Sequence, residues 1–150
     1  MEEAFSPVEV IGGDWSKGLL LLCDHARNAL PAQYGTLGVP RQEFVRHIAY
    51  DIGARDVTLG LARQLGVPAV LSTYSRLLID PNRGEDDPTI VMRLSDGTVI
   101  PGNHPISEAE IASRIERFHR PYHEAIDAAI RQALRNGVIP AVLSIHSFTP

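Results

Sequence analysis

The stretch from Leu19 to Asn28 constrains the fold of this 150-residue chain more than any other. It begins with an unbroken apolar run, Leu19 to Cys23, and then turns abruptly polar. A short, bounded apolar run of this kind predicts a fully buried strand of an α/β sheet. Ligands of such sheets bind outside the carboxyl ends of the strands, where Asp24, His25 and Asn28 fall.

A second apolar segment near the end of the sequence repeats this arrangement. Residues 141–145 (AVLSI) predict another buried strand, and His146 follows it directly. Two strands far apart in sequence would then each deliver a histidine at the same edge of the sheet. Catalytic zinc is usually held by three N or O ligands and keeps one open position. His25 and His146 could supply two of them, and the nearest carboxylates for the third are Asp24, Asp51 and Asp80.

Composition sets the broad class of the protein. A hydrophobic content of 44% and a charged content of 21% are ordinary for one soluble domain, which we expect to span residues 1–150. The net charge of −4 argues against a general nucleic-acid binder. Apolar runs are too short to cross a membrane, and the acidic N-terminus does not resemble a signal peptide. The single cysteine, Cys23, fits a reducing cytoplasm.

The apolar segments alternate between strand and helix patterns. Besides 19–23 and 141–145, residues 8–11 and 68–72 predict strands, the first of them at an edge. A helix between 19–23 and 68–72 would complete a parallel βαβ unit. The alternation predicts an α/β fold with a mainly parallel sheet and helices on both faces.

Two long segments have helical periodicity. The first is expected to begin at Pro40 and to end at Gly66, a favourable C-cap. The second is expected to begin at Ser107, which forms a capping box with Glu110, and to be kinked or restarted at Pro121. Between the two helices, residues 76–80 predict a short extended piece, and residues 84–105 predict a long surface loop that contains a hairpin.

Arginines frame the segment from Arg76 to Arg83. A guanidinium binds a carboxylate through two parallel hydrogen bonds, so this segment suits an acidic substrate. A second arginine could stabilise the oxyanion that develops when water attacks an amide carbonyl. The alternative is a salt-bridged loop in which Arg83 pairs with Glu85 or Asp86, and charge pattern alone slightly favours it.

Other residues with chemical potential fit structural roles better. His119 and His123 have helical spacing, but Pro121 between them favours packing or support of a site over metal binding. Cys23 ends an apolar strand, where an inert thiol is more common than a nucleophile. Ser144 and Ser147 flank His146 without the glycine elbow of a serine hydrolase.

Five segments, taken in order, resemble the N-formylglutamate amidohydrolase family from about residue 18 to the end of the chain. They are residues 23–31 (CDHARNALP), 47–54 (HIAYDIGA), 74–83 (YSRLLIDPNR), 118–123 (FHRPYH) and 144–150 (SIHSFTP). The family is related to zinc carboxypeptidases and aspartoacylases. The resemblance implies a zinc-dependent hydrolase of N-acyl amino acids on a three-layer α/β/α fold with a mainly parallel mixed sheet, phosphorylase/hydrolase-like.

The resemblance also implies a zinc site. The relatives bind zinc with a His-x-x-Glu pair and a later histidine, which His25 and His146 match. Asn28 stands where the glutamate is expected, and a neutral amide is a weaker ligand, so we expect Asp51 to supply the carboxylate.

The same resemblance implies how a substrate is held. The relatives' Asn-Arg pair, which holds the substrate carboxylate, matches Asn82 and Arg83. The arginine that polarises the scissile carbonyl matches Arg76.

One element of the family has no counterpart in this sequence. Family members are longer and carry a glutamate, the general base, on a strand after the later histidine, whereas this sequence ends four residues beyond His146. We expect that the chain is truncated, that Glu124 or Asp80 substitutes, or that the chain is not a competent enzyme. A truncated sheet would expose an edge and favour homo-oligomers.

The leading hypothesis is zinc-dependent hydrolysis of an N-acylated acidic amino acid such as N-formylglutamate, a small-molecule substrate. Its rival is a non-catalytic domain that binds a carboxylate or a metal but lacks the base. A third hypothesis is a metal-free hydrolase that uses Cys23 and His25.

Overall fold

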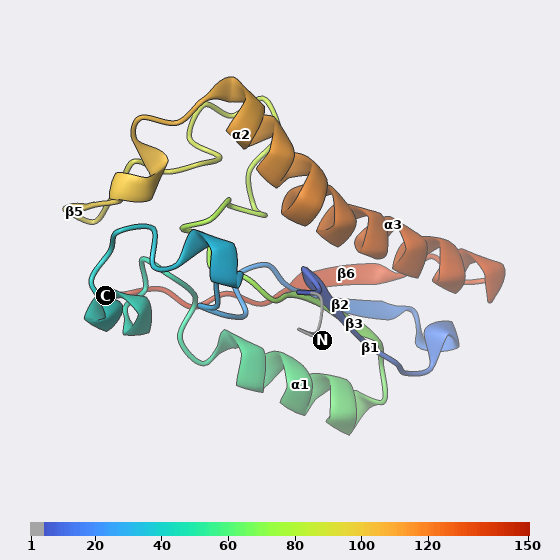
Figure 1. Cartoon of the computed structure of the whole chain (residues 1–150). Coiled ribbons are helices and arrows are strands. Elements are labelled where there is room, and N and C mark those ends of the chain that lie inside the picture. The colour runs from blue at the N-terminus through green and yellow to red at the C-terminus, as the bar shows by residue number, and fades with distance from the viewer. Residues whose placement is uncertain (1–4) are drawn as a thin grey trace.

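A four-stranded sheet lies between two layers of helices in the computed structural model, which describes residues 5–150 (Figure 1). The strand order is β1 (Val8–Ile11), β3 (Ala69–Ser72), β2 (Leu19–Cys23) and β6 (Ala141–Ser144). β2 runs parallel to both β3 and β6, and β1 pairs antiparallel with β3. The mixed, mainly parallel sheet confirms the expected α/β fold.

The helix α1 (Ala54–Leu65) covers one face of the sheet. Its buried Ala54 and Ala62 pack with Leu21, Cys23 and Leu71, which point to this face from β2 and β3. Because parallel strands are covered on both faces, the central strands are apolar throughout.

The opposite face is covered by α3 (Arg120–Arg135). Tyr122 and Ala129 pack there with Leu20, Leu22 and Val70. A shorter helix, α2 (Glu108–Arg114), begins as predicted at Ser107, whose side chain accepts a hydrogen bond from the Glu110 amide at 3.1 Å. A π-helical turn over Ile115–His119 joins α2 to α3, so the restart falls where Pro121 predicted it.

The expected start of the first helix was wrong. Pro40 is followed by a short 3₁₀ helix over Arg41–Val45 and then by turns, and α1 begins only at Ala54. Gly53 precedes it with φ of 81°, a left-handed conformation that interrupts a helix. The end at Gly66 is confirmed, since its amide bonds to Ala62 O across a left-handed cap.

Two of the expected irregular segments also differ. Residues 76–80 are not a strand: residues 76–78 form a turn, with Leu78 N donating to Ser75 O at 3.0 Å. The segment 84–105 is not confined to the surface, because Ile90, Ile100 and Asn103 are buried. Its hairpin is present but reduced to two-residue strands, β4 (Leu94–Ser95) and β5 (Thr98–Val99).

The last strand is where expected, but its expected burial was wrong. β6 pairs with β2 and forms one edge of the sheet, and its Val142 and Leu143 side chains are each 47% exposed. An edge strand with exposed apolar residues is a surface that pairs readily with other chains.

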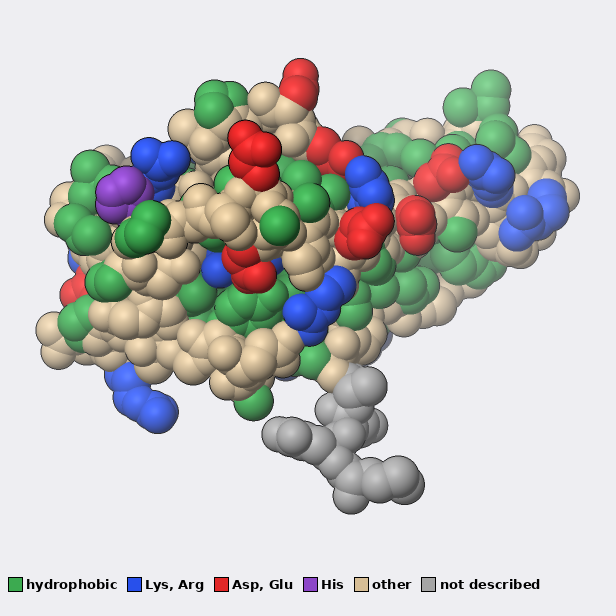
Figure 2. Space-filling view, turned by 45° about the horizontal axis from the view of Figure 1, so that its top comes forward, with side chains coloured by type: hydrophobic (Ala, Val, Ile, Leu, Met, Phe, Trp, Pro, Cys, Tyr) green, Lys and Arg blue, Asp and Glu red, His purple; other side chains and the backbone are tan. Residues whose placement is uncertain are grey.

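The surface carries both signs of charge. On the face drawn in Figure 2, acidic and basic side chains are interspersed. Residues 5–150 contain no helix that is both long and apolar enough to span a bilayer.

Candidate metal centre

Two strand ends and one turn bring three potential metal ligands together. His25 follows β2 and His146 follows β6, the strand that pairs with β2 in parallel. Asp51 lies in the turn before α1, and its amide donates to His25 O at 2.9 Å, which holds that turn against the end of β2. One ligand atom of each residue lies within 4.8 Å of the other two.

His25 presents one ring nitrogen to this centre. Its Nε2 lies 2.7 Å from Asp80 Oδ1, so this nitrogen carries the proton and donates it to the carboxylate. Its Nδ1 is buried without a hydrogen-bond partner and lies 3.5 Å from Asp51 Oδ2. The tautomer that Asp80 selects therefore leaves a lone pair on Nδ1 directed at the centre.

His146 is held in the same way by a different carboxylate. Its Nε2 lies 3.2 Å from Asp24 Oδ2 and 3.0 Å from Ser144 Oγ, both of which can accept its proton. Its Nδ1 lies 2.9 Å from Asp51 Oδ2. Two acceptor atoms at this distance repel, so a proton or a cation must lie between them.

These contacts fit a divalent metal. His25 Nδ1, His146 Nδ1 and Asp51 Oδ2 form a two-histidine, one-carboxylate set, and each histidine is oriented from behind by an aspartate. Histidines that bind metals almost always donate their other nitrogen to such a partner. The orphaned Nδ1 of His25 would gain the partner that it lacks.

The structure separates the candidates for the third ligand. Asp80 and Asp24 lie behind the histidines, with their oxygens engaged there. Asn28 is turned away, because its amide donates to Phe44 O at 2.6 Å. Asp51 is the carboxylate that faces both histidines.

Asp51 is also surrounded by groups that stabilise its negative charge. Arg76 donates to its Oδ1, and the Ser147 amide lies 3.4 Å from its Oδ2. Burial opposes ionisation of Asp51, but His25, Arg76 and His146 together hold its pKa well below the usual range. The carboxylate is therefore ionised, as a metal ligand must be.

The pKa of His25 is set by burial and by the two carboxylates on either side of its ring. Burial lowers the pKa of His25, but Asp51 and Asp80 raise it above its ordinary value. The same contact lowers the pKa of Asp80 despite burial.

Arg76, Asn82 and Arg83 lie beside the centre, in one cavity of about 370 Å³ with the three ligands. Arg83 is salt-bridged, but its partners are Asp80 at 3.4 Å and Asp87 at 3.3 Å, so the expected pairing with Glu85 or Asp86 was wrong. The backbone N–H of Asn82 donates to Asp80 Oδ1 at 2.9 Å.

The helical histidines support this cavity from behind. His119 Nε2 lies 2.8 Å from Arg83 O, and His123 Nε2 lies 2.9 Å from Pro81 O. Their rings are 4.4 Å apart between centroids. Through these contacts they fix the backbone that carries Asn82.

Tyr122 is a part of the site that sequence reasoning missed. Its hydroxyl, buried under the sheet, donates to Asp24 Oδ1 at 2.6 Å, and Ser144 donates to Asp24 Oδ2 at 3.1 Å. Burial and the neighbouring Asp24 raise the pKa of Tyr122, so it remains a donor. A tyrosine on the apolar stripe of α3 was a weak signal, because its polar tip needs a buried partner.

Two further candidates are not supported. Cys23 is fully buried, and burial raises the pKa of its thiol to about 11, which argues against a nucleophile. Glu124 is exposed on α3 and does not line the cavity, and Asp80 is bound to His25. Neither carboxylate is placed as the substitute base.

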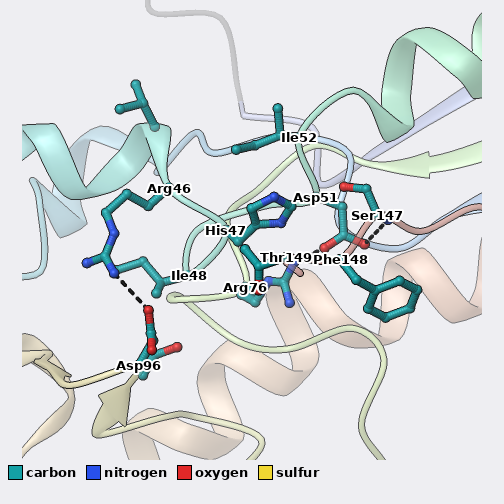
Figure 3. A pocket seen from close by; sticks show the side chains of 12 residues that line it. Arg46, His47, Ile48, Asp51, Ile52, Arg76, Asp96, Ser147, Phe148 and Thr149 are labelled. Atoms are coloured by element: carbon teal, nitrogen blue, oxygen red, sulfur yellow. Dashed lines mark hydrogen bonds and ion pairs between the residues drawn. The ribbon is translucent and has the colours of Figure 1, made fainter.

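A second cavity, of about 510 Å³, is lined by the side chains drawn in Figure 3. Asp51, Arg76, Ser147 and Phe148 line both cavities and form the wall between them. Arg76 Nε and Ser147 Oγ in this wall are buried without hydrogen-bond partners. The wall therefore offers unused polar atoms next to the three candidate ligands.

Comparison with known proteins gives one family and two informative structures. The family model for N-formylglutamate amidohydrolase matches residues 17–150. A gene product from Agrobacterium tumefaciens of known structure is 34% identical, with a TM-score of 0.90, over 96% of this chain and 57% of that chain. No curated protein matches.

The second structure is the N-formylglutamate amidohydrolase from Ralstonia eutropha. It is 24% identical, with a TM-score of 0.77, over 96% of this chain and 59% of that chain, and at this identity it shows the shared fold. The chain spans less than two thirds of the length of both solved structures.

Proposed function

The chain belongs to the N-formylglutamate amidohydrolase family, and on this premise we propose that it hydrolyses the amide bond of an N-acyl acidic amino acid such as N-formylglutamate, with zinc as its metal. The observation that carries the proposal is the convergence of His25 Nδ1, His146 Nδ1 and Asp51 Oδ2. A set of two imidazoles and one carboxylate suits zinc, which takes N and O ligands and retains an open position for water or substrate.

The chain's own residues would hold the metal and its ligands in place. Asp80 and Asp24 keep the two histidines in the tautomer that presents Nδ1. His25, Arg76 and His146 together keep the pKa of Asp51 low, so that its carboxylate is ionised. When bound, zinc lowers the pKa of a coordinated water and polarises a carbonyl.

Arg83 and Asn82 would bind the carboxylate of the substrate. Arg83 contacts Asp87 and Asp80 at 3.3 and 3.4 Å and donates to Thr89 Oγ1 at 2.5 Å, so a substrate carboxylate would replace these partners around its guanidinium. The backbone of Arg83 is held by His119, whose Nε2 contacts Arg83 O. The position from which the Arg83 side chain enters the cavity is therefore fixed before a substrate binds.

Arg76 would stabilise the charge that develops on the carbonyl oxygen. It lies in the wall next to Asp51, and its Nε has no hydrogen-bond partner. A donor placed where negative charge develops contributes more in the transition state than in the ground state. Alanine at Arg76 should therefore lower kcat more than it raises KM, although it also removes a partner of Asp51.

The test is metal content and turnover together. After incubation with zinc and gel filtration, the native chain should carry about one zinc and hydrolyse N-formylglutamate. The double variant His25→Ala, His146→Ala should carry none and be inactive, whereas the exposed His104→Ala is the matched control and should behave as native. A native chain without zinc would overturn the proposed metal chemistry.

A second candidate is a domain that binds the substrate without hydrolysing it. The observation in its favour is that the cavity's carboxylates, Asp51, Asp80 and Asp87, are each engaged by a histidine, arginine or hydroxyl. None is free to act as a general base. Saturable binding of N-formylglutamate with no formate released, in a zinc-loaded chain, would favour this candidate.

A further inference from the structure

The second cavity is larger than a formyl group requires. It measures about 510 Å³, within the range of pockets that hold whole small molecules. A formyl group adds only a hydrogen beyond the carbonyl carbon. If the proposed substrate lies across the wall between the two cavities, most of this space is unused by a formyl substrate.

The order of residues along the two cavities matches the order of groups in an N-acyl amino acid. Asn82 and Arg83 line only the first cavity, Asp51 and Arg76 line the shared wall, and Ile48 lines only the second. In the substrate the carboxylate, the amide carbonyl and the acyl chain follow in the same order. A carboxylate on Arg83 and a carbonyl at the wall would direct the acyl chain into the second cavity.

The walls of this cavity are partly apolar and poorly covered. Ile48 is buried, but Val45, Ile52 and Phe148 are 65%, 44% and 85% exposed. Apolar side chains grouped around a hollow are typical of ligand sites. An aliphatic acyl chain would remove part of their surface from water.

The charged groups of the cavity are largely satisfied. Arg46 donates to Asp96 at 2.8 Å, a contact drawn as a dashed line in Figure 3. Arg76 donates to Asp51. His47 points into the cavity between them. Arg76 Nε and Ser147 Oγ remain without partners at the wall, where the carbonyl would lie, and the apolar side chains border the remaining space beside His47.

We propose that this cavity is an acyl-chain subsite and that the chain accepts N-acyl amino acids with acyl groups of several carbons. The inference rests on the proposed function and extends it to the acyl group. Val45 is a specificity-determining residue in this view, because it lines the second cavity and not the cavity that holds His25 and His146.

The test is a substrate series on one amino acid, with N-formyl, N-acetyl, N-butyryl and N-hexanoyl glutamate. Formyl amides are intrinsically more reactive, so the trend is read from acetyl to hexanoyl. We expect kcat/KM to rise about twofold to fourfold per methylene until the chain fills the cavity, in line with burial of apolar surface. A flat or falling series would overturn the subsite.

Two variants fill the cavity and one controls for a surface tryptophan. Val45→Trp, from the 3₁₀ helix, and Ser95→Trp, from the hairpin, should abolish the rise while the formyl substrate is cleaved at the native rate. Val57→Trp places the same side chain on an exposed site of α1 and should leave the series unchanged. A uniform loss on all four substrates in both filled variants would also count against the subsite.

Binding separates this inference from the proposed function. If none of the four substrates is cleaved, the hydrolase proposal fails, but calorimetric titration of the same four compounds still measures the subsite. Affinity should then rise from acetyl to hexanoyl in the native chain and not in Val45→Trp. Equal affinities throughout would overturn the inference by itself.

Discussion

Asp51 connects more of the site than any other single residue. One carboxylate oxygen accepts from Arg76, and the other faces both histidines and the Ser147 amide. Because Asp51 is nearly fully buried, this arrangement leaves it with a negative charge that must be balanced from several sides. Arg76 supplies one positive charge, and a cation at the centre would supply the rest.

Asp24 tests whether the support behind a histidine matters for metal binding. In Asp24→Asn the acceptor for His146 Nε2 and for the Tyr122 hydroxyl is weakened. We expect zinc affinity to fall about 10-fold to 100-fold, the usual effect of losing such a partner. Competition with a chromophoric chelator measures it.

The matched control for this change is Asp127→Asn. Asp127 is an exposed carboxylate on α3 that pairs with Arg131, and its loss should leave zinc affinity unchanged. If the native chain and Asp24→Asn bound zinc with equal affinity, His146 would not be oriented by Asp24.

The reactivity of Cys23 tests whether the carboxyl end of β2 is closed to solvent. With a thiol pKa of about 11, roughly one molecule in a thousand carries the thiolate at pH 8, and the side chain is also fully buried. We expect no reaction with a thiol reagent in native buffer and one thiol per chain in guanidinium chloride. Rapid labelling of the native chain would show that the end of β2 opens to solvent. Cys23 would then again be a candidate nucleophile.

At the scale of elements, the sequence predicted strands better than helix starts. Apolar runs such as Leu19–Cys23 locate strands because both faces of a central strand are covered. Apolar spacing before α1 was misleading, because Ile48 is buried from a turn, where it packs with Leu77. Nor could the pattern tell that the apolar β6 lies at an edge, since strand order depends on contacts distant in sequence.

Gly53 and Gly60 test the start of α1. Gly53 has φ of 81°, and a Cβ there would meet no described atom within 4 Å, so Gly53→Ala adds backbone strain without a clash. We expect a loss of about 1 kcal/mol in the free energy of unfolding. Gly60 lies inside α1 with an ordinary backbone and equal space, so Gly60→Ala should gain about 0.5–1 kcal/mol.

Urea unfolding of the two variants measures both values with one method. The opposite signs are the point of the comparison, because each change adds the same methyl group. If Gly53→Ala were neutral, the turn that carries Asp51 would tolerate another conformation, and the metal centre would be less rigid than its contacts indicate.

At the scale of the whole molecule, the candidate site is assembled from segments far apart in sequence. Sequence alone could place His25 and His146 together, because both follow strands predicted to run parallel in one sheet. The residue pattern alone left Asp24, Asp51 and Asp80 open, because all three fall at the same edge, and Asp51 was preferred only because Asn28 stands where the family resemblance expects a glutamate. That choice depends on side-chain direction, which the hydrogen bonds of the folded chain decide.

This assembly predicts that zinc stabilises the fold. His25, Asp51 and His146 converge only in the native state, so a metal bound by all three shifts the unfolding equilibrium by mass action. At a free zinc concentration about 100 times Kd the gain is about 2.7 kcal/mol. For a chain of this length that corresponds to a rise in Tm of about 5–10 °C.

Thermal unfolding with zinc, with a chelator and with magnesium measures the effect and its selectivity. Magnesium should give little or no shift, because it prefers oxygen ligands in octahedral geometry and two of the three donors are imidazoles. The variant His25→Ala, His146→Ala should lose the zinc shift, and His104→Ala should keep it. An undiminished shift in the double variant would mean that zinc stabilises the chain from another site, and the two strand ends would then have to be explained without a metal.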